Sequence, residues 1–171
     1  VMAGVTPLIG VQEAGMGEGQ VTALTGTAQL IAGIVGLVIG SWLGDRFGAK
    51  WSSIAMLVAW LFFYLSMMLA QAVWSDPSFA RVMIIGWFSL DTLLTVVAIP
   101  ITMRLCRVKV AATQFTIYMA LNNMGISLGT VLLGLSESLG GLVKLFPILM
   151  IANGVALLIL LVVRFPRRRL Q

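Results

Sequence analysis

The residue best placed to do chemistry in this sequence is Asp91, which lies close to the midpoint of the apolar stretch 81–103. An ionised aspartate at the centre of a membrane helix costs roughly 2.5–3.5 kcal/mol on insertion scales, so a carboxyl group there usually has a function. Thr95 lies one helical turn further on, and its hydroxyl could donate a hydrogen bond to the carboxylate. Asp91 is therefore a candidate for binding and releasing a proton at mid-membrane. The alternative is a structural carboxylate that pairs with a basic group elsewhere.

A second set of polar residues lies within the stretch 111–135. Gln114, Tyr118 and Asn122 follow one another at intervals of four residues, so they share one helix face, and Asn123 begins a neighbouring polar row. Hydrogen-bonding groups at membrane depth must face protein or water rather than lipid. This face is a candidate lining for a solute path, and hydrogen bonds between helices are the alternative interpretation.

Other kinds of chemistry lack the residues they need. The chain has no histidine and one cysteine, Cys106, and Asp91 is the only carboxylate within a predicted span. A membrane-embedded enzyme would need a nucleophile with a base, a metal cluster or paired carboxylates. We therefore expect no catalytic residue, no metal and no cofactor. Cys106 lies in a basic loop, where an inert thiol is the simpler interpretation and a mildly activated one the alternative.

The composition is that of a polytopic membrane protein. Hydrophobic residues make up 60% of the 171 positions and charged residues only 10%, far from the values of soluble domains. We expect an all-α bundle that occupies residues 1–171, in which 1–10 end a helix and 11–20 form an exposed loop. Five stretches are long enough to span a bilayer, at about 21–43, 51–73, 81–103, 111–135 and 143–163.

The first of these spans carries small residues at strict four-residue intervals: Ala28, Ala32, Gly36, Gly40 and Gly44. Such a stripe lets two helix backbones approach closely in lipid. The spacing fits either a static contact or a sliding one.

The charges predict an orientation. The segments 44–50, 104–109 and 164–171 hold nine of the eleven Lys and Arg residues, whereas Arg81 and Lys144 lie on the other side. The positive-inside rule places the basic side and the C-terminus in the cytoplasm. Because the charge is patterned in this way, the net charge of +5 does not indicate nucleic-acid binding.

Between the first two spans lies a short charged segment with two glycines, which we expect to be a tight loop. Its notable residues are Gly44, Asp45, Arg46, Gly48 and Lys50. The segment resembles the signature loop of the major facilitator superfamily, Gly-x-Leu-small-Asp-Arg/Lys-x-Gly-Arg/Lys-Arg/Lys. It departs from that pattern at Ser41 and Ala49, as the second copy of the motif in the family often does. The chain is thus similar to the C-terminal half, from the end of helix seven to helix twelve.

This resemblance implies a secondary transporter that works by alternating access, with the motif holding one gate closed through contacts of Asp45 and Arg46 with neighbouring helix ends. Its partners would be a small-molecule substrate, protons, the lipid bilayer and an N-terminal half. The segment 112–125 resembles helix eleven of the muropeptide and acetyl-CoA permeases, which implies import of peptidoglycan fragments across a bacterial inner membrane. Siderophore permeases carry a similar Ala-Thr-Gln-Phe segment, and a non-transporting assembly or receptor subunit is a further alternative.

Overall fold

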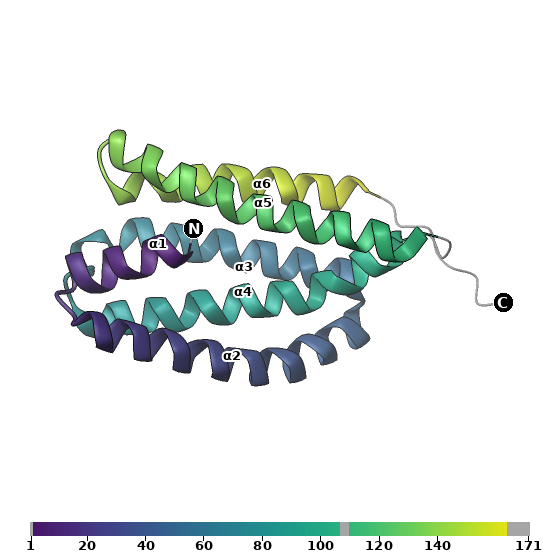
Figure 1. The fold of residues 1–171 in the computed structure, drawn as a ribbon, viewed down its shortest axis with the longest axis horizontal. Helices are drawn as coiled ribbons and strands as arrows, with labels where there is room; N and C mark the ends of the chain where they lie inside the picture. The colour runs from purple at the N-terminus through teal and green to yellow at the C-terminus, as the bar shows by residue number, and fades with distance from the viewer. Residues whose placement is uncertain (1, 107–109, 164–171) are drawn as a thin grey trace.

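The computed structural model describes residues 2–106 and 110–163, and within these ranges every regular element is helical (Figure 1). The elements, in chain order, are α1 (Met2–Pro7), the π-helix η1 (Leu8–Glu13), α2 (Glu18–Phe47), α3 (Ala49–Leu69), the 3-10 helix η2 (Gln71–Val73), α4 (Pro77–Leu105), α5 (Ala111–Ser138), the 3-10 helix η4 (Leu142–Lys144) and α6 (Leu145–Val162). Figure 1 shows α2 along one edge, α3 and α4 in the middle, and α5 and α6 along the opposite edge.

Five helical segments are long and apolar enough to cross a membrane, as the sequence predicts: Glu18–Phe47, Ala49–Leu69, Pro77–Met103, Ala111–Ser138 and Leu142–Val162. The predicted spans differ from them mainly at their ends, because polar residues prolong several helices beyond the apolar stretch. The span predicted for 51–73 instead ends its α-helix at Leu69 and continues, after Ala70, as the short 3-10 helix η2.

The predicted loop 44–50 is wrong in its extent. Helix α2 continues through Phe47, and Gly48 alone separates it from α3. Gly48 makes the reversal with a φ of 79°, a conformation that costs glycine little and other residues more. The Ser52 hydroxyl donates a 2.8 Å hydrogen bond to the carbonyl oxygen of Leu43 and so ties the two helix ends together.

The predicted loop 11–20 is also shorter in the structure. Helix η1 continues to Glu13 and α2 begins at Glu18, which leaves residues 14–17 as the connection. At the same end of the bundle, Pro77 is the first residue of α4. The Asp76 carboxylate accepts a 2.8 Å hydrogen bond from the Ser78 backbone N–H, so Asp-Pro is here a helix cap followed by the first helical residue.

The stripe of small residues on α2 forms a close helix contact with α4. Ala28, Ala32, Gly36 and Gly40 are buried. A methyl group added at Gly36 would lie 2.7 Å from Cγ2 of Thr92, closer than side chains normally approach. Gly44, the last member of the stripe, has no such neighbour. Four of the five members of the stripe are therefore buried, and Gly36 and Gly40 among them pack closely on α4.

Helices α3, α4 and α6 share an aromatic core. Trp60 and Tyr64 of α3 meet Trp87 of α4 with ring centroids 5.4 and 6.1 Å apart. Tyr64 also meets Phe146 of α6 at 6.4 Å. Such tilted and edge-on pairs add to the stabilisation that their buried area provides. This cluster fixes α3 between its two neighbours.

Helix α5 is the least buried of the long helices. Every residue from 120 to 128 is exposed, polar and apolar alike. Its contacts with α4 and α6 are sparse compared with those between α2 and α4. The middle of α5 therefore lies on the outside of the bundle.

Candidate functional site

Asp91 lies at the midpoint of α4, as predicted, and its side chain is exposed. Trp87 lies one turn before it, with its ring 6.1 Å from that of Tyr64 of α3. Thr95 lies one turn beyond Asp91 and is also exposed. Within the described ranges, neither Asp91 nor Thr95 has a hydrogen-bond partner for its side chain. The aromatic core thus lies on one side of the Asp91 carboxyl group, and the other side of that group is open.

The predicted polar face of α5 is only partly turned toward the protein. Gln114 and Tyr118 are half-buried, whereas Asn122 and Asn123 are exposed near the helix midpoint. No hydrogen bond of either asparagine side chain is found in the described part of the chain. Among the polar groups of α5, this asparagine pair would therefore cost the most free energy in an apolar environment.

The hydroxyl groups of α5 behave differently. Those of Thr116, Ser127 and Thr130 donate hydrogen bonds to the carbonyl oxygens four residues earlier, at 2.9, 3.4 and 3.3 Å. Such bonds satisfy a hydroxyl without any other helix. The polar residues of α5 are therefore of two kinds: these hydroxyl groups have partners within the helix, whereas the amides of Asn122 and Asn123 have none among the described residues.

The structure does not bring the two candidate sets into contact. No hydrogen bond joins Asp91 or Thr95 to the polar residues of α5 among the described residues. Asp91 and Thr95, like Asn122 and Asn123, lie instead on surfaces that this bundle leaves uncovered. A site that used both would need further protein to close it.

In the charged motif, Lys50 makes the contact with a neighbouring helix end. Its ammonium group donates hydrogen bonds to the carbonyl oxygens of Leu161 and Val163, at 3.2 and 2.7 Å, where α6 ends. The carbonyl groups of the last turn have no partner within the helix, and a cation there also complements the helix dipole. Motif and C-terminal helix are thus joined on the basic side of the bundle.

The Arg46 guanidinium lies over the rings of Trp42 and Phe47, 5.8 and 5.9 Å from their centroids. Asp45 is exposed and forms no ion pair or hydrogen bond within the described residues. The family resemblance assigns the helix-end contact to Asp45 and Arg46, so their role in a gate stays a prediction.

Several features were not found by sequence reasoning. Asn153 of α6 donates a 3.0 Å hydrogen bond to the carbonyl oxygen of Leu57 on α3. Its own Oδ1 and the indole N–H of Trp60 are buried and have no hydrogen-bond partner among residues 2–106 and 110–163. The spacing of Trp60, Phe63 and Tyr64 on one face of α3 was the available signal for the aromatic core. Cys106 is buried, with its thiol donating to the Thr102 carbonyl at 3.3 Å.

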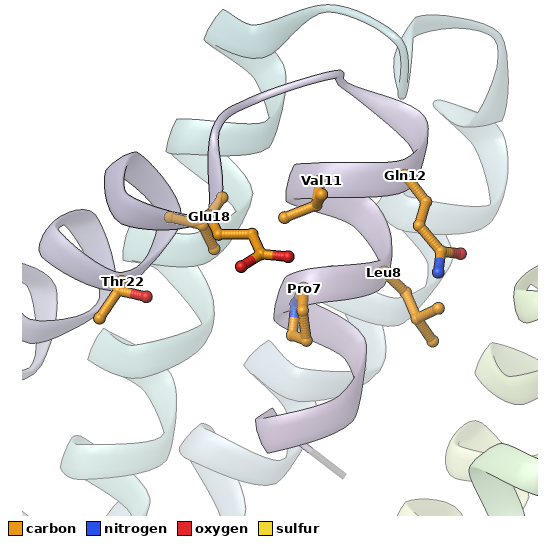
Figure 2. A pocket seen from close by; sticks show the side chains of 7 residues that line it. Pro7, Leu8, Val11, Gln12, Glu18 and Thr22 are labelled. Carbon is orange, nitrogen blue, oxygen red and sulfur yellow. The ribbon is translucent and has the colours of Figure 1, made fainter.

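A cavity that is open on one side lies beside the start of α2, between that helix and the segment α1–η1 (Figure 2). Its volume is about 390 Å³, and its lining residues are Pro7, Leu8, Val11, Gln12, Glu18, Val21 and Thr22. Figure 2 shows the Glu18 carboxylate between α2 and η1, near Pro7 and Val11. Sequence reasoning placed Glu18 in an exposed loop and gave it no role.

The fold defines a class: an all-helical bundle with five helices that can cross a bilayer, which indicates a multi-pass membrane protein. The sequence matches no protein-family model, and neither a curated protein nor a solved structure is significantly similar to it. The functional conclusion therefore rests on the residues and their arrangement.

Proposed function

We propose that this chain is the C-terminal half of a proton-coupled secondary transporter of the facilitator type, which imports a small organic solute by alternating access. The observation that carries the proposal is the exposure of Asp91 and of the pair Asn122–Asn123 at the midpoints of two apolar helices. Groups of this kind are costly in lipid, so they favour a water-filled path or another set of helices beside them.

The two sets would have different roles in such a transporter. Asp91 can bind a proton when its surroundings open to one side of the membrane and release it when they open to the other. The neutral acid would be the form that crosses a closed, apolar state, because desolvation penalises the carboxylate. Asn122 and Asn123 provide amide donors and acceptors that suit a neutral, polar solute.

The closely packed helices suit a rigid half of a rocking transporter. Close packing of α2 on α4, together with the aromatic core of α3, α4 and α6, makes these four helices one unit. Alternating access moves one such unit against another around a central site. The contact of Lys50 with the end of α6 would keep the motif and the C-terminal helix together during that movement.

The resemblance of the segment 112–125 to muropeptide permeases supports peptidoglycan fragments as the substrate class and the bacterial inner membrane as the location. Siderophores are the competing class. Uptake of each class by sealed vesicles that contain the complete transporter would decide between them.

The test of the mechanism is Asp91→Asn in the complete transporter, because this change keeps the shape of the side chain and removes its titration. We expect accumulation against a gradient to fail while exchange of solute without net proton movement continues. Asp76→Asn is the matched control, since it removes the same charge at a helix cap where asparagine is equally suitable. Accumulation by Asp91→Asn with a normal pH dependence would exclude Asp91 as the coupling group.

A non-transporting assembly subunit is the second candidate, because the exposed middle of α5 also suits a permanent protein interface. In that case Asn122→Ala would weaken assembly with the partner. In the transporter it would instead lower the affinity for the solute.

A further inference from the structure

The cavity beside Glu18 lies at the opposite end of α2 from Gly48 and at a different level from Asp91. It is formed by segments that follow one another in the sequence: the end of α1, the π-helix η1 and the first turns of α2 (Figure 2). A volume of about 390 Å³ falls within the range of sites for small ligands. The cavity is thus a second place where this chain could bind a small molecule.

The backbone around the cavity is fixed by close contacts. A methyl group added at Gly10 would lie 2.8 Å from Cγ2 of Val21, so η1 and α2 approach closely there. The connection between them is closed by hydrogen bonds from the Ala14 N–H to the Ile9 carbonyl and from the Met16 N–H to the Gly10 carbonyl, each 2.9 Å long. The cavity therefore lies between elements held in a fixed relation.

The lining combines apolar walls with one charge. Pro7, Val11 and Val21 provide apolar surface, and the Glu18 carboxylate lies between the two segments (Figure 2). Glu18 forms no ion pair or hydrogen bond in the described part of the chain. The N-terminal turn of α2 favours a negative side chain at this position. That interaction still leaves the Glu18 carboxylate oxygens able to accept hydrogen bonds from a ligand.

No basic residue lines the cavity. Glu13, at the end of η1, is a second acidic residue of the same segment. The basic residues at this end of the bundle are Arg81 and Lys144, which belong to α4 and η4, and neither forms an ion pair with Glu18 in the described ranges. Glu18 is therefore the one charged residue among those that line the cavity.

We propose that this cavity binds a small organic cation with an apolar body, such as an alkyl or aryl ammonium. The carboxylate would attract the charged group, and the apolar walls would contact the rest of the molecule. A bare metal ion is a poor fit, because one carboxylate with an amide and a hydroxyl provides too few oxygen ligands. An anion of the same size would be repelled.

The binding does not depend on the transport mechanism. Its residues belong to α1, η1 and the start of α2, whereas Asp91 and the asparagine pair belong to α4 and α5. Equilibrium binding to the purified protein can therefore be measured without any transport assay. Failure of the cation site would leave the proposed function intact, and the reverse is also true.

The probe is benzyltrimethylammonium, which carries a permanent charge on an aromatic body, and its counterpart is phenylmethanesulfonate, of similar size and opposite charge. Binding is measured by calorimetry on the protein in nanodiscs of zwitterionic lipid, which themselves attract neither ion strongly. We expect saturable binding of the cation and none of the sulfonate. Glu18→Gln should weaken cation binding at least fivefold, and Val11→Trp, which fills the cavity, should abolish it.

Glu13→Gln is the matched control, because it removes the same charge from η1 at a residue outside the lining. It should change the affinity less than twofold. Equal losses in Glu18→Gln and Glu13→Gln would show a diffuse surface charge instead of a site. Equal binding of the sulfonate and the cation would show an apolar groove without charge selection, and either result would overturn the proposal. Thermal unfolding of each variant without ligand separates lost binding from lost folding.

Discussion

Replacing Gly36 by alanine tests the close contact of α2 with α4. The added methyl group would lie 2.7 Å from Cγ2 of Thr92 and 3.9 Å from the backbone nitrogen of Leu93. An ordinary van der Waals contact for such a carbon begins near 3.4 Å, so the helices must separate by several tenths of an ångström or Thr92 must move. Overpacking of this kind costs typically about 1–3 kcal/mol. We expect Gly36→Ala to lower the free energy of unfolding by that amount.

Gly33→Ala is the matched control on the same helix. Nothing lies within 4 Å of a methyl group added there. Because alanine favours a helix over glycine, Gly33→Ala should be neutral or should stabilise the protein by up to about 1 kcal/mol. The opposite signs expected for the two variants separate packing from helix propensity.

A compensating change makes the prediction sharper. Thr92→Ser removes the methyl group that is struck, after which the nearest atom to the new carbon is Cβ of residue 92 at 3.4 Å. The double variant should therefore recover most of the stability lost in Gly36→Ala. Thr92→Ser alone measures the effect of losing the Thr92 methyl group. The single and double variants together form a double-mutant cycle that isolates the interaction between residues 36 and 92.

The assay is reversible unfolding in mixed micelles, followed by the reactivity of Cys106. This thiol is buried at the end of α4 and is the only one in the chain, so its exposure reports on the helix under test. If Gly36→Ala and Gly33→Ala have the same stability, α2 and α4 do not pack as closely in the membrane as the structure shows. If Thr92→Ser fails to rescue Gly36→Ala, the clash has been assigned to the wrong atom.

Three further predictions concern the basic side, the orientation and the contact of α6 with α3. Lys50→Met removes the donor to the end of α6 and should cost about 0.3–1 kcal/mol, with faster hydrogen exchange confined to the last turn of α6; unchanged exchange there would mean that water replaces the lysine fully. A cysteine at Ser75 in a Cys106→Ser background should react only with reagents added outside the cell, and labelling from the cytoplasmic side alone would reverse the orientation. Asn153→Leu loses a hydrogen bond of a kind that averages about 0.6 kcal/mol in membranes, but it also removes a buried oxygen that has no partner in the described part of the chain, so the stability should change little. A loss of several kcal/mol would indicate that Asn153 has a partner beyond Leu57.

The sequence predicts the class of fold because the relevant signals are local. A bilayer-length apolar stretch must satisfy its own backbone, and a helix is the way to do so within one segment. Five such stretches are therefore enough to predict five spanning helices, and the four-residue spacing from Ala28 to Gly40 is enough to predict a close-packed face. The same periodicity puts Asp91 and Thr95 on one face of α4, both of them exposed as it turns out.

The exact helix ends were not predictable from hydropathy alone. Charged residues that end an apolar run do not end a helix, since Asp45 and Arg46 continue α2 at little cost in the polar interface. The chain reverses only at Gly48, because glycine adopts a positive φ most easily. In the same way, Asp76 and Pro77 belong to the helix that follows them. Asp76 caps α4, and Pro77 is its first helical residue.

By itself, the sequence determined that this is an α-helical chain with five segments able to span a membrane and a carboxyl group at the midpoint of one of them. The partner that each face meets depends on the tertiary structure. That structure places Gly36 of α2 against Thr92, directs Lys50 to the end of α6, and leaves Asn122 exposed instead of beside Asp91. The physical reason is that periodicity fixes which residues share a face of one helix, whereas the neighbour of that face is chosen by the packing of the whole bundle.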